Sequence, residues 1–222
     1  MSDTYQLERM DGVPSLKAKA YAAIKEAILS LRLEPGAPLV EGDLAQQLGI
    51  SKTPVRDALQ VLEREGFVSR VHFRGTFVTE VSVPDIMEVF QCRAVLEGLA
   101  ASLAAPLLSD EELEWMDQEL TAAEAALADG NLTLCSQRGQ GVHNAIIDKA
   151  GNARLTSIIH NLDDHVRRFR ILSDRINGRL NKSVQEHRAI QAALRKRDPA
   201  VAEVAMRNHL FSVLQDLSLP GE

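Results

Sequence analysis

The chain has 222 residues, of which 45% are hydrophobic and 25% are charged, and its formal net charge at pH 7 is −6. This composition is ordinary for a soluble protein, and the length favours two smaller domains over one large domain. The negative net charge argues against indiscriminate nucleic-acid binding, although a basic region can be hidden in the sum.

Charge is strongly partitioned along the chain. Residues 1–80 carry 10 Lys/Arg against 11 Asp/Glu, residues 81–130 carry 1 against 11, and residues 131–222 carry 14 against 9. Within the first segment, the run 52–74 holds five basic residues against three acidic ones. A locally positive stretch therefore exists inside an acidic protein.

The cysteines and the apolar runs bear on where the protein resides. Cys92 and Cys135 lie far apart with no disulfide pattern, which favours reduced thiols in a reducing compartment, and we expect both thiols to be buried and inert. The N-terminus has no secretory signal, and no apolar run approaches the roughly 18 residues needed to span a bilayer. We expect a cytoplasmic protein without a membrane partner.

The first 81 residues are predicted to form three helices and a hairpin. Apolar residues recur at helical spacing from Leu16 to Leu31 behind a capping Ser15, a two-turn helix ends at Gly49, and a third helix follows it. After the third helix the apolar residues, Phe73 among them, belong to β-type runs on either side of HFRG at 72–75. Three helices followed by a two-stranded ribbon constitute a winged helix-turn-helix.

The third helix begins with GISKTPVRDAL, which combines small polar groups, a proline and cations at its first turn. Ser51 can cap this helix, Thr53 and the free first-turn amides can bind phosphate, and proline is tolerated where an amide has no helical partner. Lys52 and Arg56 point outward, and Arg56 is free to reach guanine edges or phosphate. Val55, Leu59 and Leu62 form the buried stripe.

This third helix could also be an ordinary capped surface helix with solvated charges. Its context favours DNA binding instead: a short helix ending in glycine precedes it, and Arg70, His72 and Arg74 surround the following hairpin tip. The run YAAIKEAILSLRLEPGAPLVEGDLAQQLGISKTPVRDALQVLEREGFVSRVHFRGTFV resembles the winged-helix domain of GntR-type bacterial transcription regulators.

The GntR resemblance implies DNA contacts at two places. They lie on the recognition helix and in the wing, at Ser51, Lys52, Thr53, Arg56, His72, Arg74 and Gly75. Gly42 stands where the fatty-acid-responsive branch of the family often has arginine, so the operator sequence of that branch does not carry over.

Residues 82–222 are predicted to form a six-helix antiparallel bundle, with the domain boundary near residue 81. The short connections favour antiparallel neighbours, and capping signals set the expected helices at 84–107, 110–129, 132–149, 153–174, 179–196 and 199–217. The phrases EVFQCRAVLEGLAASLAA, VHNAIIDKAGNARL, EHRAIQAALRKRD and AMRNHL resemble the FCD ligand-binding domain of the FadR-like branch, and six helices resemble its VanR-type subgroup.

His143, His187 and His209 lie within apolar stripes of three different helices. Taken singly, each is more simply a structural histidine that is hydrogen-bonded to a neighbour. Three that converge would suit a divalent metal, with zinc favoured and nickel or manganese not excluded. The FCD resemblance implies such a site completed by an aspartate four residues before the first histidine, where this chain has Gly139. A three-histidine site and a metal-free polar pocket therefore both stay open.

Arg93 matches an FCD position that faces the ligand pocket, and its guanidinium is well suited to gripping a carboxylate. Glu97, one turn further on, offers it a structural partner instead. The combined reading is a homodimeric, ligand-responsive regulator, a repressor that a small organic acid releases from a palindromic DNA operator.

Two alternatives to this regulator are a metal-sensing regulator and a three-histidine metalloenzyme with an appended DNA-binding module. The enzyme alternative needs a base near a metal-bound water. Glu186 adjoins His187 in sequence but points about 100° away on a helix, so we do not expect an enzyme.

Overall fold

A computed structural model of the chain describes residues 15–173 and 179–218. Its contacts divide the chain into two compact units, Met1–Glu80 and Val81–Glu222. Each unit has its own hydrophobic core, and each is described below by itself.

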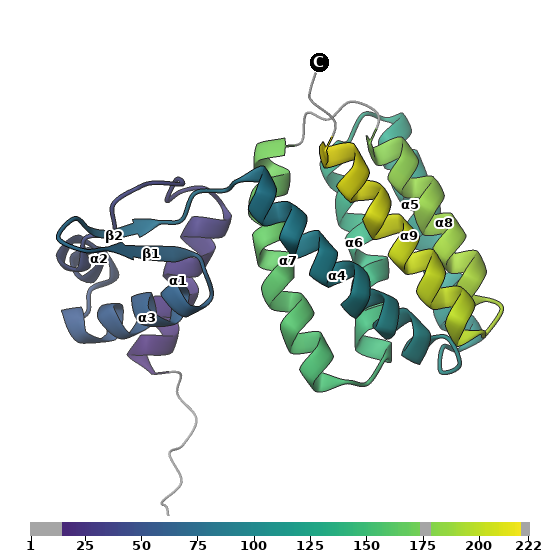
Figure 1. Cartoon of the computed structure of the whole chain (residues 1–222), viewed down its shortest axis with the longest axis horizontal. Coiled ribbons are helices and arrows are strands. Elements are labelled where there is room, and N and C mark those ends of the chain that lie inside the picture. The colour runs from purple at the N-terminus through teal and green to yellow at the C-terminus, as the bar shows by residue number, and fades with distance from the viewer. Residues whose placement is uncertain (1–14, 174–178, 219–222) are drawn as a thin grey trace, which may run out of the picture. The chain divides into compact units, whose positions relative to one another are not determined.

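The first unit contains three helices and a two-stranded hairpin (Figure 1). In chain order the elements are α1 (Leu16–Leu29), α2 (Glu41–Leu48), α3 (Lys52–Arg64), β1 (Val68–Val71) and β2 (Gly75–Val78). Ser15 caps α1 by accepting a hydrogen bond from the amide of Ala18, and Gly49 ends α2 in the left-handed conformation at φ +66°. These elements form the predicted winged helix-turn-helix.

The core of the first unit explains the apolar spacing of α3. Val55, Leu59 and Leu62 are completely buried, and α1 packs against them through residues that include Ile24 and Ile28. The hairpin is antiparallel, with Val68 opposite Val78. An isolated antiparallel bridge from Pro38 to Phe77 extends it at one edge. The apolar face of α3 is thus packed against α1, which leaves the polar first turn of α3 on the opposite, solvent side.

Helices are the only regular elements among the described residues of the second unit. Its elements are α4 (Val83–Ala104), α5 (Asp110–Ala128), α6 (Leu132–Lys149), α7 (Ala153–Ser173), α8 (Arg179–Leu194) and α9 (Pro199–Ser218). Local chemistry sets several starts: Ser82 caps α4, Ser109 and Glu112 form a reciprocal capping box on α5, and Asp198 accepts the first amides of α9. The expected end of α7 at residue 174 lies outside the described residues.

Packing brings α4 against α9, α7 and α6, and α5 against α6 and α8. In Figure 1, α4 crosses the front of the bundle between α7 and α9. None of the helices among the described residues is both long and apolar enough to cross a bilayer. Cys135 is buried as expected, whereas Cys92 is exposed on α4, so the expectation of a buried thiol is wrong there. The predicted fold class, a winged helix-turn-helix followed by a helical bundle, is confirmed.

Candidate DNA-contacting surface and metal centre

The amino end of α3 presents a polar turn to solvent. Ser51, Lys52, Thr53 and Arg56 are exposed, while Val55 between them is buried. Ser51 occupies the predicted N-cap position, but its side chain makes no capping hydrogen bond. The free first-turn amides point to this end of the helix, where Ser51 is exposed, and such an end suits phosphate oxygens.

Arg56 is not free, which corrects the sequence-based expectation. Its Nε lies 3.1 Å from both carboxylate oxygens of Glu41, and its Nη2 donates to Glu41 Oε2 at 2.8 Å. The hydrogen bond from Arg56 is the main reason why the pKa of Glu41 is lowered. Glu41 opens α2, which packs on α3, so the contact depends on two helices meeting. A two-pronged contact of this kind fixes the plane of the guanidinium.

The wing brings His72 and Arg74 to the hairpin tip, and both are exposed. The amide of Arg74 donates to the carbonyl of Val71 at 3.0 Å, which closes the turn. Gly75 has a φ of +110°, a conformation that requires glycine. Phe73 is at the tip with a φ of +60° rather than in a strand, which differs from the expectation of a β-type run.

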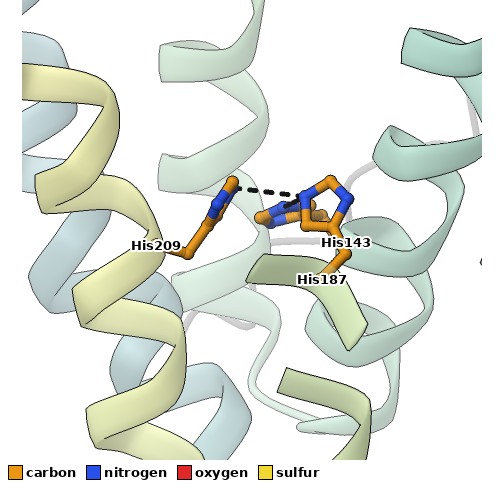
Figure 2. A group of neighbouring side chains, drawn as sticks. All are labelled: His143, His187 and His209. Atoms are coloured by element: carbon orange, nitrogen blue, oxygen red, sulfur yellow. Dashed lines mark hydrogen bonds between the residues drawn. The ribbon is translucent and has the colours of Figure 1, made fainter. Parts of the chain in front are cut away.

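The structure brings the three predicted histidines together in the second unit. His143 on α6, His187 on α8 and His209 on α9 are each buried, and their rings face one another in Figure 2. His187 Nε2 lies 3.0 Å from His143 Nε2 and 3.2 Å from His209 Nε2. All three potential ligand atoms are within 4.8 Å of one another.

Two carboxylates orient two of these rings. Glu97 Oε2 lies 2.5 Å from His143 Nδ1, and Glu186 Oε2 lies 2.8 Å from His209 Nδ1. Burial tends to raise the pKa of each glutamate, but hydrogen bonds and nearby cations outweigh it and lower both pKa values to about 2. Because an ionised carboxylate only accepts, each Nδ1 is the donor, and each Nε2 is left facing the other rings.

Each glutamate is held in turn by an arginine. Arg93 Nε donates to Glu97 at 2.6 Å, and Arg179 Nη2 donates to Glu186 at 2.8 Å. Burial is the largest influence on His209 and lowers its pKa to about 4, so the ring is neutral at pH 7. The Arg179–Glu186–His209 chain thus presents a neutral imidazole in the tautomer that a metal requires, and the Arg93–Glu97–His143 chain orients its ring in the same way.

Arg93, the predicted effector grip, is only 1% exposed. Besides Glu97, it pairs with Asp163 of α7 at 3.0 Å through Nη2. Glu97 is therefore the structural partner of Arg93, as the sequence suggested. One guanidinium nitrogen, Nη1, is buried and has no hydrogen-bond acceptor among the described residues.

Gly139 has a spatial explanation. A Cβ placed on it would lie 2.7 Å from Cε1 of His187. The imidazole of His187 therefore fills the space that a side chain at position 139 would need. Gly139, which stands where the family has an aspartate, therefore leaves room for the ring of His187, the middle ring of the histidine cluster.

The donor set fits a divalent metal. Zinc binds imidazole nitrogens at about 2.0–2.1 Å, which places two ligands of a tetrahedral site roughly 3.3 Å apart. The nitrogen separations of 3.0 and 3.2 Å are close to that value. His143, His187 and His209 could hold the ion, and their second-layer carboxylates are of the kind that raises ligand basicity.

The carboxylate considered as an enzymatic base has another role here. Glu186 binds His209 and Arg179. Sequence reasoning found the three histidines but missed the functions of Glu186, Arg179 and Asp163. Glu97 had a local signal, four residues after Arg93, whereas the Glu186–His209 contact spans two helices and has none.

Together these features define a class: a winged helix-turn-helix DNA-binding protein fused to a helical domain with a buried polar centre. Residues 16–78 match the family described as bacterial regulatory proteins, gntR family, and residues 88–212 match the FCD domain. The chain therefore belongs to the FCD-containing GntR regulators, as the resemblance indicated, and is a DNA-binding transcription regulator with a ligand-binding domain.

Individual relatives agree with this assignment. The uncharacterized HTH-type regulator YdhC of Bacillus subtilis is 27% identical, with 85% of each chain covered. The Probable D-xylose utilization operon transcriptional repressor of Paenarthrobacter nicotinovorans is 31% identical, over 82% of this chain and 80% of its own. The structure of E. coli McbR/YncC superposes with a TM-score of 0.72 at 25% identity, over 92% of this chain and 98% of that one.

Proposed function

We propose that the protein is a homodimeric repressor that a small organic acid releases from a palindromic operator. Residues 1–81 would bind the DNA and residues 82–222 would bind the effector. One observation carries the proposal: the same chain contains an exposed polar turn on α3 and a buried histidine centre that Glu97 links to Arg93. A relative named as an operon repressor supports the sign of regulation. A regulator of chromosomal DNA would act in the cytoplasm.

The proposed DNA contacts follow from exposure and chemistry. On α3 they are Ser51, Lys52, Thr53 and Arg56, whose hydroxyls, amides and cations suit phosphates and guanine edges in the major groove. Glu41 would hold the Arg56 guanidinium in one orientation. In the wing, His72, Arg74 and the backbone of Gly75 would contact the flanking duplex.

The proposed metal ligands are His143, His187 and His209. Zinc suits a site of three imidazoles best, and titrating the protein with nickel or manganese would show whether these ions bind there instead. When bound, the ion would act as a Lewis acid toward an oxygen ligand. The protein's own contribution is orientation, because Glu97 and Glu186 keep two of the imidazoles in the ligating tautomer.

A carboxylate is the proposed effector class because of the charge around the histidine centre. Arg93 contributes a buried cation whose Nη1 has no partner among the described residues. A hydrogen bond to an ionised group is roughly twice as strong as a neutral one. An organic acid that reaches Arg93 Nη1 would therefore satisfy an otherwise costly buried donor.

The outward face of α4 is the proposed surface for the second copy. Val95, Leu99 and Leu103 follow one another at four-residue spacing and are 55%, 43% and 37% exposed. The two charged residues of α4 beyond residue 91, Arg93 and Glu97, are both buried, so this face carries no charge. Depletion of charge is typical of interface cores. Leu99→Glu should dissociate the dimer in sedimentation experiments, whereas Leu132→Glu, at an equally exposed leucine on α6, should not.

Two measurements test the proposal as a whole. The full chain should enrich a symmetric duplex from a randomised pool, and thermal shifts should identify a stabilising acid from a panel of carboxylates, with and without chelator. Adding that acid should lower the affinity for the enriched duplex. Failure to enrich any sequence over random duplex would end the proposal.

A metal-sensing regulator is the second candidate, favoured by the three-imidazole donor set. The two candidates differ in whether the ion is the signal or part of the site. Operator affinity measured against Zn²⁺ and chelator, without organic acid, separates them. A change of affinity with metal alone would favour the sensor, and a constant affinity would favour the acid-responsive repressor.

A further inference from the structure

Phe73 at the tip of the wing is the most exposed large hydrophobic side chain among the described residues, at 96%. It follows β1 and precedes β2, in a turn closed by the bond from Arg74 to Val71. Its φ is +60°. The tip of the hairpin therefore projects an aromatic ring into solvent from a left-handed backbone.

Neither the turn conformation nor solubility accounts for a phenylalanine at position 73. A positive φ is rare for bulky side chains, and glycine, asparagine or aspartate would take the same conformation with little strain. A polar side chain would also avoid exposing an apolar ring to water. Phe73 therefore carries both the cost of its backbone conformation and the cost of its exposed ring. We take this as a sign that the ring contacts an external partner.

The surroundings of Phe73 identify the chemistry of that partner. His72 lies against the ring, with centroids 3.8 Å apart and planes tilted by 56°. Arg74 follows directly, and Arg70 lies on β1 of the same hairpin. A single aromatic ring flanked by cations suits a nucleic-acid duplex, whose phosphates attract the cations and whose base faces become available to a ring where a step is unstacked.

We infer that Phe73 is a wedge that enters the minor groove of the bound duplex and partly unstacks one base step. This rests on the proposed DNA-binding role of residues 1–81. Four-residue strands carry the tip about 13 Å along the hairpin. This length is comparable to the major-groove width of about 12 Å, so with α3 in the major groove the tip would be able to reach the flanking groove. Apolar wedges open base steps from the minor groove, where Arg74 would also be favoured.

The wedge predicts a sequence preference that requires no hydrogen bond to a base. Pyrimidine–purine steps such as TA and CA unstack most easily, so the step facing the wing should be of this type. This preference is separate from direct reading by Arg56 on α3. Substituting Phe73 should relax it while leaving the bases under the recognition helix specified.

The test uses the full chain and a duplex enriched from a randomised pool by the wild-type protein. Phe73→Ala should bind this duplex roughly tenfold more weakly in fluorescence anisotropy, as expected for the loss of one aromatic–base contact. Phe73→Trp should retain binding. Leu16→Ala removes an apolar side chain that is 53% exposed on α1 and is the matched control, with unchanged affinity expected.

A second readout distinguishes a wedge from a simple contact. With 2-aminopurine at each adenine of the duplex in turn, wild-type protein should raise the fluorescence at one step, and Phe73→Ala should abolish that rise. Wild-type affinity for Phe73→Ala, or no fluorescent step with the wild type, would overturn the wedge while leaving the regulator intact. No enriched duplex at all would overturn both.

Discussion

Gly139→Ala is the sharpest test of the histidine centre, because it adds one methyl group next to one ring. The added Cβ would lie 2.7 Å from Cε1 of His187. Gly139 is inside α6, where alanine is favoured over glycine by about 1 kcal/mol in helix propensity. The substitution should therefore disturb the cluster without weakening the helix.

The size of the disturbance follows from contact distances. Carbon atoms pack at about 3.5–4.0 Å, so the imidazole of His187 has to retreat by roughly 1 Å. Metal–ligand distances tolerate only about 0.2 Å. His187 is the middle ring, with contacts to both other imidazoles, so its displacement removes a central ligand. We expect zinc affinity to fall about 100-fold, which corresponds to ~2.7 kcal/mol.

The assay is competition for Zn²⁺ between the purified protein and a chromophoric chelator. Gly141→Ala is the matched control, since a Cβ there meets only Glu119 Oε2, at 3.8 Å. Gly141→Ala should bind zinc as the wild type does, and both metal-free variants should keep the helical circular dichroism of the wild type, which separates a loss of zinc binding from a loss of fold. Wild-type zinc affinity in Gly139→Ala would refute the reasoning that His187 is confined by position 139.

Two further predictions follow from the same geometry. Glu186→Gln should lower zinc affinity about 10- to 100-fold, because the amide holds His209 less firmly in the ligating tautomer; Glu119→Gln is the control, and equal losses in both would contradict this role. Arg56→Ala should weaken binding to the enriched duplex by at least ~1–3 kcal/mol while the bundle unfolds at its usual temperature. Glu41→Gln should instead relax sequence preference, measured against mismatched duplexes, and unchanged discrimination would argue against an orienting carboxylate.

Much of the fold could be predicted from the sequence because the deciding interactions are local. Ser15, the Ser109–Glu112 pair and Asp198 act within three residues of themselves, so the chain order alone sets where their helices begin. The burial of Val55, Leu59 and Leu62 likewise follows from their spacing on one helix face. Phe73 was placed wrongly because apolar alternation does not distinguish the last strand residue from a turn residue.

By itself, the sequence determined the class of protein and the three helices that carry histidines on apolar faces. Only the tertiary structure decided that these rings meet, that Glu186 of α8 orients His209 of α9, and that Glu41 of α2 holds Arg56 of α3. Those contacts depend on how each helix is rotated about its axis when side chains of neighbouring helices interlock. That rotation is a result of packing the whole core, and no short stretch of residues encodes it.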